Sequence, residues 1–322
     1  ALFNTEYGVV ETPYTEADES YAAKRRSQKS GVRTRQLPGV SPLVFSRFLL
    51  EKTAFLSLSD MGKALPSYEE IPIACEMDEA VETEYRRIEH KLVQVLRTDR
   101  RVAKKILSAY LNLLTIYADQ PYDQRPIFYP DSDVPIVEPE NIGDADTLGE
   151  KEQKTLEIVN AAIQNGERAL IYTSWVRTDS QQKLKKLLTD EGYRTEILTD
   201  KIKTTDREDW VQKKLAAGMQ VLITNPSLVE TGLDLNTFTT LVFYSMGYKL
   251  FTLRQASRRS WRINQKAPAV KVYMLYYEDT MQQKCLKLMA SKLAVAGLIE
   301  GNFSEEGLAA MRDVQDMTSQ MA

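Results

Sequence analysis

The chain has 322 residues, of which 43% are apolar and 27% charged, and its formal net charge is −3. These values are typical of a soluble globular protein with room for one large domain or two ordinary ones. The net charge excludes a uniformly basic coat for nucleic acid, so any such contact must come from local patches.

The cysteine and histidine content argues against a disulfide-stabilised fold and against a metal site. Cys75 and Cys285 lie far apart and form no C-x-x-C pair, so a disulfide framework is not expected. His90 is the only histidine, which excludes a His/Cys metal site. No run of residues is apolar enough to span a membrane and the N-terminus has no secretory signal, so we expect a cytoplasmic protein without a membrane partner.

The first 76 residues differ from the rest of the chain. Residues 1–40 have little apolar periodicity and are predicted to form a basic flexible segment. A basic loop that contacts nucleic-acid phosphates is the alternative. Residues 41–76 include an apolar stretch whose pattern is helical as far as residue 73. The basic residues of the first segment are Lys24, Arg25, Arg26, Lys29, Arg33 and Arg35.

Residues 77–150 are predicted to form a helical protrusion followed by a Pro-rich acidic loop on the surface. Helical periodicity covers 78–96 and 101–117. Asp78 and Glu79 precede a helix and do not follow a strand, so we interpret them as an acidic first turn and not as a metal-binding acidic box. Four basic residues near the second helix form a solvated face, with contact to a duplex backbone as the alternative. They are Arg100, Arg101, Lys104 and Lys105.

From residue 151 to residue 300 the pattern alternates between strand and helix. This alternation predicts an α/β fold, a RecA-like parallel sheet flanked by helices. Residues 301–322 are predicted to be a helical tail that frays at its end. The expected strands are 169–173, 194–198, 220–224, 240–245 and 270–276. The expected helices are 152–165, 178–191, 205–216, 250–260 and 279–296.

The predicted helix after the fourth of these strands carries an unusual cluster of arginines. No acidic residue occurs between Leu250 and Glu278 to relieve their charge. At about 100° per residue, a continuous helix would place Gln255, Arg259 and Arg262 within about 60° of one another. Such a cluster favours an anion, and planar guanidinium groups suit a triphosphate. Arg258 lies at the edge of the same face, and Arg254 adds to the cluster.

Two motifs carry a resemblance to a known family. Residues 231–235 read TGLDL and residues 255–265 read QASRRSWRINQ. They resemble motifs V and VI of superfamily 2 helicases of the Swi/Snf type. Their residues are most similar to those of the Snf-type helicases of bacterial mobile elements and phages. The resemblance implies a prokaryotic, nucleic-acid-associated protein whose residues 151–300 are the second of two RecA-like lobes.

The resemblance assigns roles to the arginine cluster. It implies that Arg259 and Arg262 are arginine fingers, which enter an ATP site from the second lobe and stabilise charge on the transferring phosphoryl group. It makes Gln255 the leading glutamine of motif VI, and Gln255 and Arg258 are then expected on the ATP-binding side. A basic helix that faces solvent or an acidic partner is the alternative.

The turn of motif V couples nucleic acid to ATP in this family, and here it contains Gly232 and Asp234. Gly232 would be needed for its backbone, through a positive φ or a close approach. Asp234 would either orient an arginine finger or cap a helix, and the sequence leaves both roles open.

Polar residues at two strand ends are candidates for nucleic-acid binding. Thr173 and Ser174 stand at the motif IV position, and Thr224 and Asn225 end the motif V strand. In the family, such strand ends of the second lobe grip the phosphates of the tracked strand, and hydroxyl and amide donors suit a contact that does not read sequence. Ordinary turn and N-cap chemistry is the alternative.

No G-x-x-x-x-G-K-[ST] segment and no strand-borne acidic pair for Mg²⁺ occurs in the sequence. The resemblance therefore covers only the second half of a two-lobe motor, beginning late in the first lobe. It implies that residues 41–76 are the inter-lobe linker, because Asp60 and Leu65-Pro66 resemble the end of that linker. Phe55 and Leu56 depart from the pattern, since arginines are usual at their positions.

The expected function is therefore that of the C-terminal lobe of an ATP-dependent Snf-type DNA helicase or translocase. The resemblance implies that ATP and Mg²⁺ act in the complete enzyme and that this chain alone binds neither and is inactive. The implied partners are double-stranded DNA and the missing first lobe. Two alternatives stay open, a non-catalytic helicase-like module that binds nucleic acid or a protein, and a helicase that unwinds RNA.

Overall fold

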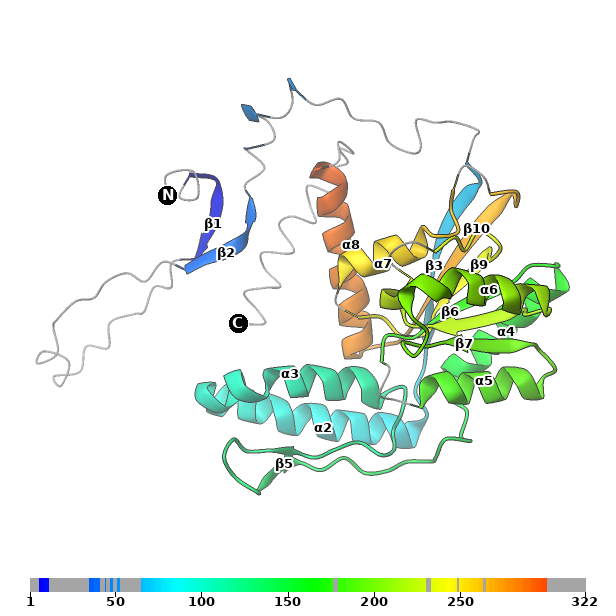
Figure 1. Cartoon of the computed structure of the whole chain (residues 1–322). Coiled ribbons are helices and arrows are strands. Elements are labelled where there is room, and N and C mark those ends of the chain that lie inside the picture. The colour runs from blue at the N-terminus through cyan, green and yellow to red at the C-terminus, as the bar shows by residue number, and fades with distance from the viewer. Residues whose placement is uncertain are drawn as a thin grey trace, which may run out of the picture.

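A computed structural model describes the chain at residues 6–11, 35–40, 44, 47–48, 51–52, 65–175, 179–229, 233–247, 249–262 and 265–299. Its centre is a six-stranded sheet with the order β3-β10-β9-β6-β8-β7, in which every neighbouring pair is parallel (Figure 1). The strands are β3 (Ser67–Cys75), β6 (Ala169–Tyr172), β7 (Thr195–Leu198), β8 (Val221–Thr224), β9 (Thr240–Phe243) and β10 (Ala269–Tyr277).

Helices cover both faces of this sheet, which confirms the predicted α/β fold. Strands β6, β8 and β9 are buried at every position, as expected for central strands of a parallel sheet, whose sequences are nearly continuous apolar runs. One face packs against α4 and α5, and the other against α6, α7 and α8. These helices are α4 (Glu150–Gln164), α5 (Ser180–Asp190), α6 (Arg207–Ala216), α7 (Leu250–Ser257) and α8 (Met281–Ile299).

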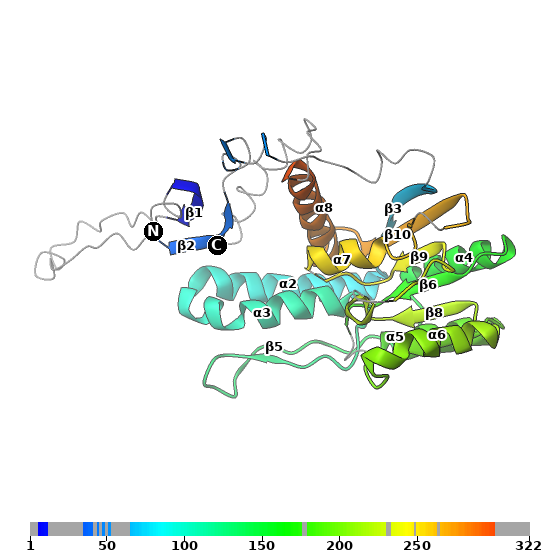
Figure 2. The ribbon, with the colours of Figure 1, turned by 45° about the horizontal axis from the view of Figure 1, so that its top comes forward.

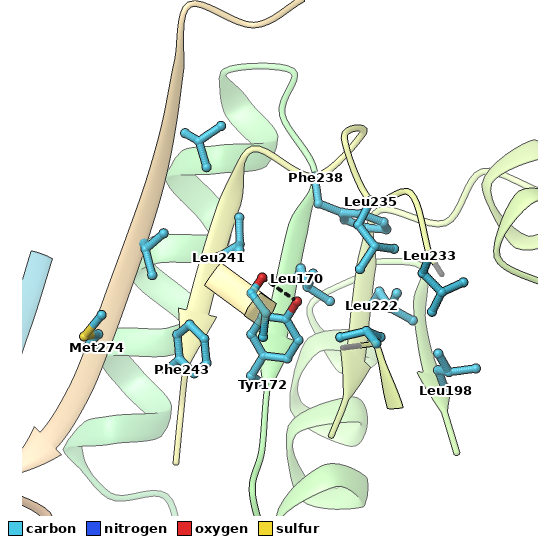
Figure 3. Close-up of a cluster of buried hydrophobic side chains, with 14 of the residues drawn as sticks. Leu170, Tyr172, Leu198, Leu222, Leu233, Leu235, Phe238, Leu241, Phe243 and Met274 are labelled. Atoms are coloured by element: carbon cyan, nitrogen blue, oxygen red, sulfur yellow. Dashed lines mark hydrogen bonds between the residues drawn. The ribbon is translucent and has the colours of Figure 1, made fainter. Parts of the chain in front are cut away.

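The core on the second face is built from alternate strand residues. Leu170, Leu222 and Leu241 point to this face from three adjacent strands (Figure 3). The ring of Tyr172 packs 4.8 Å from that of Phe243, and its hydroxyl donates to the carbonyl oxygen of Ala256 in α7 at 3.2 Å. This hydrogen bond satisfies a fully buried phenol and fixes α7 on the sheet.

Strand β3 is the sixth strand, and here the helical pattern expected as far as residue 73 is wrong. Ser67–Cys75 pairs along its whole length with β10. As an edge strand it is only half-buried, so it lacks the continuous apolar run that marks the central strands. Pro72 fits this position because an edge strand can lack one backbone donor.

The two helices predicted after residue 77 are present as α2 (Glu79–Thr98) and α3 (Arg100–Tyr117). A single residue joins them, and the carboxylate of Asp99 accepts from the backbone N–H groups of Arg101 and Val102, which caps α3. The pair extends away from the sheet in both views (Figures 1 and 2). Its own apolar core includes Tyr85, Ile88 and Leu114.

Further short elements complete the described structure. A small hairpin, β4 (Ile127–Phe128) with β5 (Pro135–Val137), lies within the loop predicted after α3. Two single turns of 3₁₀ helix, η4 (Thr204–Asp206) and η5 (Pro226–Leu228), precede α6 and follow β8. Within the segment predicted to be flexible, β1 (Gly8–Glu11) pairs antiparallel with β2 (Arg35–Val40). In the part of the chain described above, no helix has both the length and the apolar character needed to cross a membrane.

Candidate functional site

Helix α7 ends before Arg258, Arg259 and Arg262. Its last residue is Ser257, and Arg258 is the C-cap. The expectation that one helical face carries Arg259 and Arg262 together with Gln255 is therefore wrong. The residues from 258 to 262 form an irregular turn, which we call the arginine segment.

Side chains that follow α7 hold this turn against the connection between β8 and β9. The hydroxyl of Ser260, fully buried, donates to the carbonyl oxygen of Leu235 at 2.9 Å. The amide of Gln265 donates to the carbonyl oxygens of Asn236 at 2.6 Å and Ser260 at 2.9 Å. Because these bonds compete with continued helical hydrogen bonding, they account for the early end of α7.

The arginine segment presents half-buried guanidinium groups. Arg262 donates to the carbonyl oxygen of Leu233 through Nη2, over a long 3.4 Å. The guanidinium of Arg258 lies 5.7 Å from the ring centre of Trp261. Within the described residues, neither of these two arginines forms an ion pair with a carboxylate. Neither cation has a carboxylate counter-charge among the described residues, which favours an external anion.

Arg259 lies close to the buried phenol of Tyr172. Burial raises the pKa of Tyr172, and the positive charge of Arg259 acts in the opposite direction. Gln255 is half-buried on the last turns of α7, and its Oε1 atom is buried without a hydrogen-bond partner in the described structure. An acceptor in this state favours a donor from water or from a ligand.

The four candidates for nucleic-acid binding lie at the carboxyl ends of β6 and β8, and two of them are fully buried. The hydroxyl of Thr224 donates to the carbonyl oxygen of Leu198 at 3.1 Å, and that of Thr173 accepts from the amide of Gln181 at 2.8 Å. These hydroxyls tie neighbouring elements together, so a contact with a phosphate would require them to leave these partners.

Ser174 and Asn225 are less buried and belong to a polar bridge across three strand ends. The amide of Asn225 donates to the carbonyl oxygen of Ser174 at 3.1 Å, and the hydroxyl of Ser174 donates to the carbonyl oxygen of Ser245 at 3.0 Å. The backbone N–H of Ser174 in turn donates to the hydroxyl of Ser245 at 2.9 Å. Asn225 also starts η5 by accepting from Ser227. Ser245 was missed by sequence reasoning, although it ends the neighbouring strand by the same pattern.

The turn of motif V, residues 231–235, is described only in part. Gly232 lies outside the described residues. The carboxylate of Asp234 accepts from the backbone N–H of Asn236 at 3.3 Å and from its side-chain amide at 3.4 Å. The backbone N–H of Asp234 donates to Glu208 of α6 at 3.1 Å. Among its described contacts, Asp234 therefore closes a local Asx-type turn.

The polar bridge and the arginine segment lie at opposite ends of the sheet. Asn225 follows β8 at the carboxyl edge, whereas Leu235 and Asn236 precede β9 at the amino edge. The connection contacts the polar bridge through Asn225, and its residues Leu235 and Asn236 accept hydrogen bonds from Ser260 and Gln265.

Comparisons with known proteins agree with the fold described above. Residues 150–264 match the family model of the helicase conserved C-terminal domain. The chain is similar to the C-terminal part of the Fun30 ATPase domain, with 14% identity, a TM-score of 0.51, and coverage of 70% of this chain and 90% of that one. It is also similar to the Sulfolobus solfataricus SWI2/SNF2 ATPase core in complex with dsDNA, with 18% identity, a TM-score of 0.53, and coverage of 76% and 50%. The chain thus spans half the length of that core. No curated protein matches it.

Proposed function

We infer that residues 150–264, which match the family model of the helicase conserved C-terminal domain and have the fold of the similar SWI2/SNF2-type ATPase structures, act as a helicase C-terminal lobe, as the motifs at 231–235 and 255–265 predict. From this premise we propose that the chain supplies the second lobe of an ATP-dependent translocase on double-stranded DNA. Its residues complete an ATP site whose other half belongs to a first lobe.

The arginine segment carries this proposal. Phosphoryl transfer needs little covalent chemistry from a protein, and most of the catalysis is positioning and charge stabilisation. Arg259 and Arg262 supply positive charge from a turn that Ser260 and Gln265 hold in place. In the closed state of the two lobes, these guanidinium groups stabilise the charge that develops on the transferring phosphoryl group.

The remaining parts of the ATP site must come from elsewhere. The sequence has no P-loop, so the first lobe holds most of the triphosphate and the Mg²⁺ ion, which supplies further charge neutralisation. Gln255, with its unsatisfied acceptor, and Arg258 lie on the side that faces the nucleotide. Closing of the lobes brings the two halves together, and hydrolysis removes the contact that holds them closed.

The polar bridge at the opposite end is the proposed site for DNA. Ser174 and Asn225 offer hydroxyl and amide groups at adjacent strand ends, and donors of this kind position a phosphate backbone without reading its sequence. The similar SWI2/SNF2 core is described in complex with dsDNA, which supports duplex DNA over RNA as the partner. The connection from Asn225 to Asn236 links this contact to the arginine segment.

The proposal predicts that this chain alone does not hydrolyse ATP and that a separately expressed first lobe restores part of the turnover. The restored rate should rise when duplex DNA is added, and phosphate release measured at several DNA concentrations tests this. A second variant tests the proposed DNA contact. Replacing both Ser174 and Asn225 with alanine should weaken the stimulation of turnover by DNA. DNA binding by the chain without any restored turnover would instead favour a non-catalytic helicase-like module.

A further inference from the structure

Trp261 joins the arginine segment to the start of β3. Its indole N–H donates to the carbonyl oxygen of Pro66 at 2.8 Å. Its ring lies 5.0 Å from the ring of Tyr68, with an interplanar angle of 38°. On another side, the guanidinium of Arg258 lies 5.7 Å from the same indole ring. One side chain thus contacts the chain that leads into β3 and the arginine cluster at once.

The strand does not need this contact to hold its place. β3 pairs with β10 from Ser67 to Cys75, and the backbone N–H of Ser67 donates to the carbonyl oxygen of Pro268 at 2.9 Å. Trp261 itself is only partly buried at the margin of the core. Its contacts therefore contribute less to strand pairing than to the conformation of the turn that contains it.

The position of Trp261 within the turn gives it control over both proposed fingers. It directly precedes Arg262 and follows Arg259 by two residues. Displacement of the indole therefore moves the backbone that carries both guanidinium groups. A misplacement of about 1 Å in a catalytic group can cost about 100-fold in rate. Small movements at the start of β3 are thus sufficient to change catalysis.

We propose that Trp261 is a positioning residue, which fixes the arginine segment against the start of β3 and transmits displacement of the incoming chain to Arg259 and Arg262. This inference rests on the proposed function, in which the chain before β3 comes from the first lobe. Tyr68 is its partner residue, and the guanidinium of Arg258 lies over the same indole ring. Trp261 touches no reacting group in this account.

The first test uses the chain as it stands. Trp261→Leu removes the indole donor and the ring contact, and Trp261→Phe removes only the donor. Amide hydrogen exchange at residues 258–262 should become about 10-fold faster or more in Trp261→Leu, and the change in Trp261→Phe should be smaller. A 10-fold faster exchange corresponds to a free energy of local opening that is lower by about 1.4 kcal/mol. Trp210→Phe, in α6 at the margin of the same core, is the matched control and should leave this exchange unchanged.

The second test uses the complete two-lobe protein. Trp261→Leu should lower kcat about 10-fold to 100-fold while KM for ATP changes less than about twofold, because the fingers act on the transition state. Tyr68→Leu should have a similar effect, and the double variant should lose little more than either single one. If Trp261→Leu folds poorly, Tyr68→Leu still tests the inference, because it removes the ring contact from the other side.

The outcomes separate the two proposals. Unchanged kcat and unchanged local exchange in Trp261→Leu would overturn the role of Trp261. If Arg262→Ala abolishes turnover under the same conditions, only the role of Trp261 is overturned and the proposed function stands. If Arg262→Ala also leaves turnover unchanged, the proposed function itself fails.

Discussion

Replacing Arg262 with alanine should lower ATP turnover of the complete two-lobe protein by about 1,000-fold or more, because an arginine that stabilises the transition-state charge is worth about that much in kcat. The guanidinium makes only one long hydrogen bond within the described structure. Its loss should therefore leave the fold nearly as stable as before, so the loss of turnover can be assigned to chemistry. Steady-state ATP hydrolysis with saturating duplex DNA is the measurement.

Arg194 offers a matched control for this experiment. Its guanidinium also donates to a backbone carbonyl oxygen, that of Ala217 at 3.1 Å, but it lies beside β7 at the far edge of the sheet. Arg194→Ala should retain turnover within about twofold, because it removes a surface contact without transition-state charge. Arg259→Ala should resemble Arg262→Ala. Full turnover in both finger variants would contradict the assignment.

The second large effect concerns a buried ion pair between the protrusion and the lobe. Lys151 of α4 lies 2.6 Å from the carboxylate of Asp119, directly after α3, and the two side chains are 0% and 2% exposed. Its ammonium group also donates to Gln282 of α8 at 3.1 Å and lies 4.6 Å from the ring of Tyr244. The second oxygen of Asp119 is buried with no partner in the described structure. This pair is therefore sensitive to the loss of either member.

Lys151→Met should destabilise the chain by about 3–5 kcal/mol, because it leaves a buried carboxylate without its counter-charge. The double variant Lys151→Met with Asp119→Leu should recover part of this loss, since apolar residues often replace a buried ion pair at little cost. Equilibrium unfolding in urea measures both values. Melting of α2 and α3 separately from the lobe would show as a second transition.

A surface pair supplies the control. Lys105 lies 2.9 Å from Asp131, with side chains 60% and 88% exposed. Lys105→Met should leave the free energy of unfolding nearly unchanged, as is usual for exposed pairs. A change of the same small size in Lys151→Met would show that the buried pair does not hold the protrusion on the lobe.

The sequence predicted the sheet well because parallel strands covered on both faces have a simple composition. ALIY, VLIT and TLVF are short apolar runs between polar turns, and all three are central strands. β3 was missed because its pairing partner, β10, is about 200 residues later in the chain and its own pattern is only half-apolar. Pairing over such a separation leaves no local signal.

The local geometry around the candidate site residues could be predicted from the sequence only in part. The arginines were expected on a helix, but Ser260 and Gln265 end that helix through bonds to a segment about 25–30 residues earlier. Strand ends were located correctly at Thr173 and Thr224, yet both hydroxyls point into the protein. In each case the deciding partner is distant in sequence, so local periodicity could not supply it.

The proposed function requires the arginine segment to be one half of a nucleotide site, and a structure of the complete protein with ADP, Mg²⁺ and aluminium fluoride tests this most directly. In that structure, a guanidinium nitrogen of Arg262 or Arg259 should lie about 3 Å from the fluoride that replaces the transferring phosphoryl group. Closed lobes in which both guanidinium groups point away from that group would contradict it.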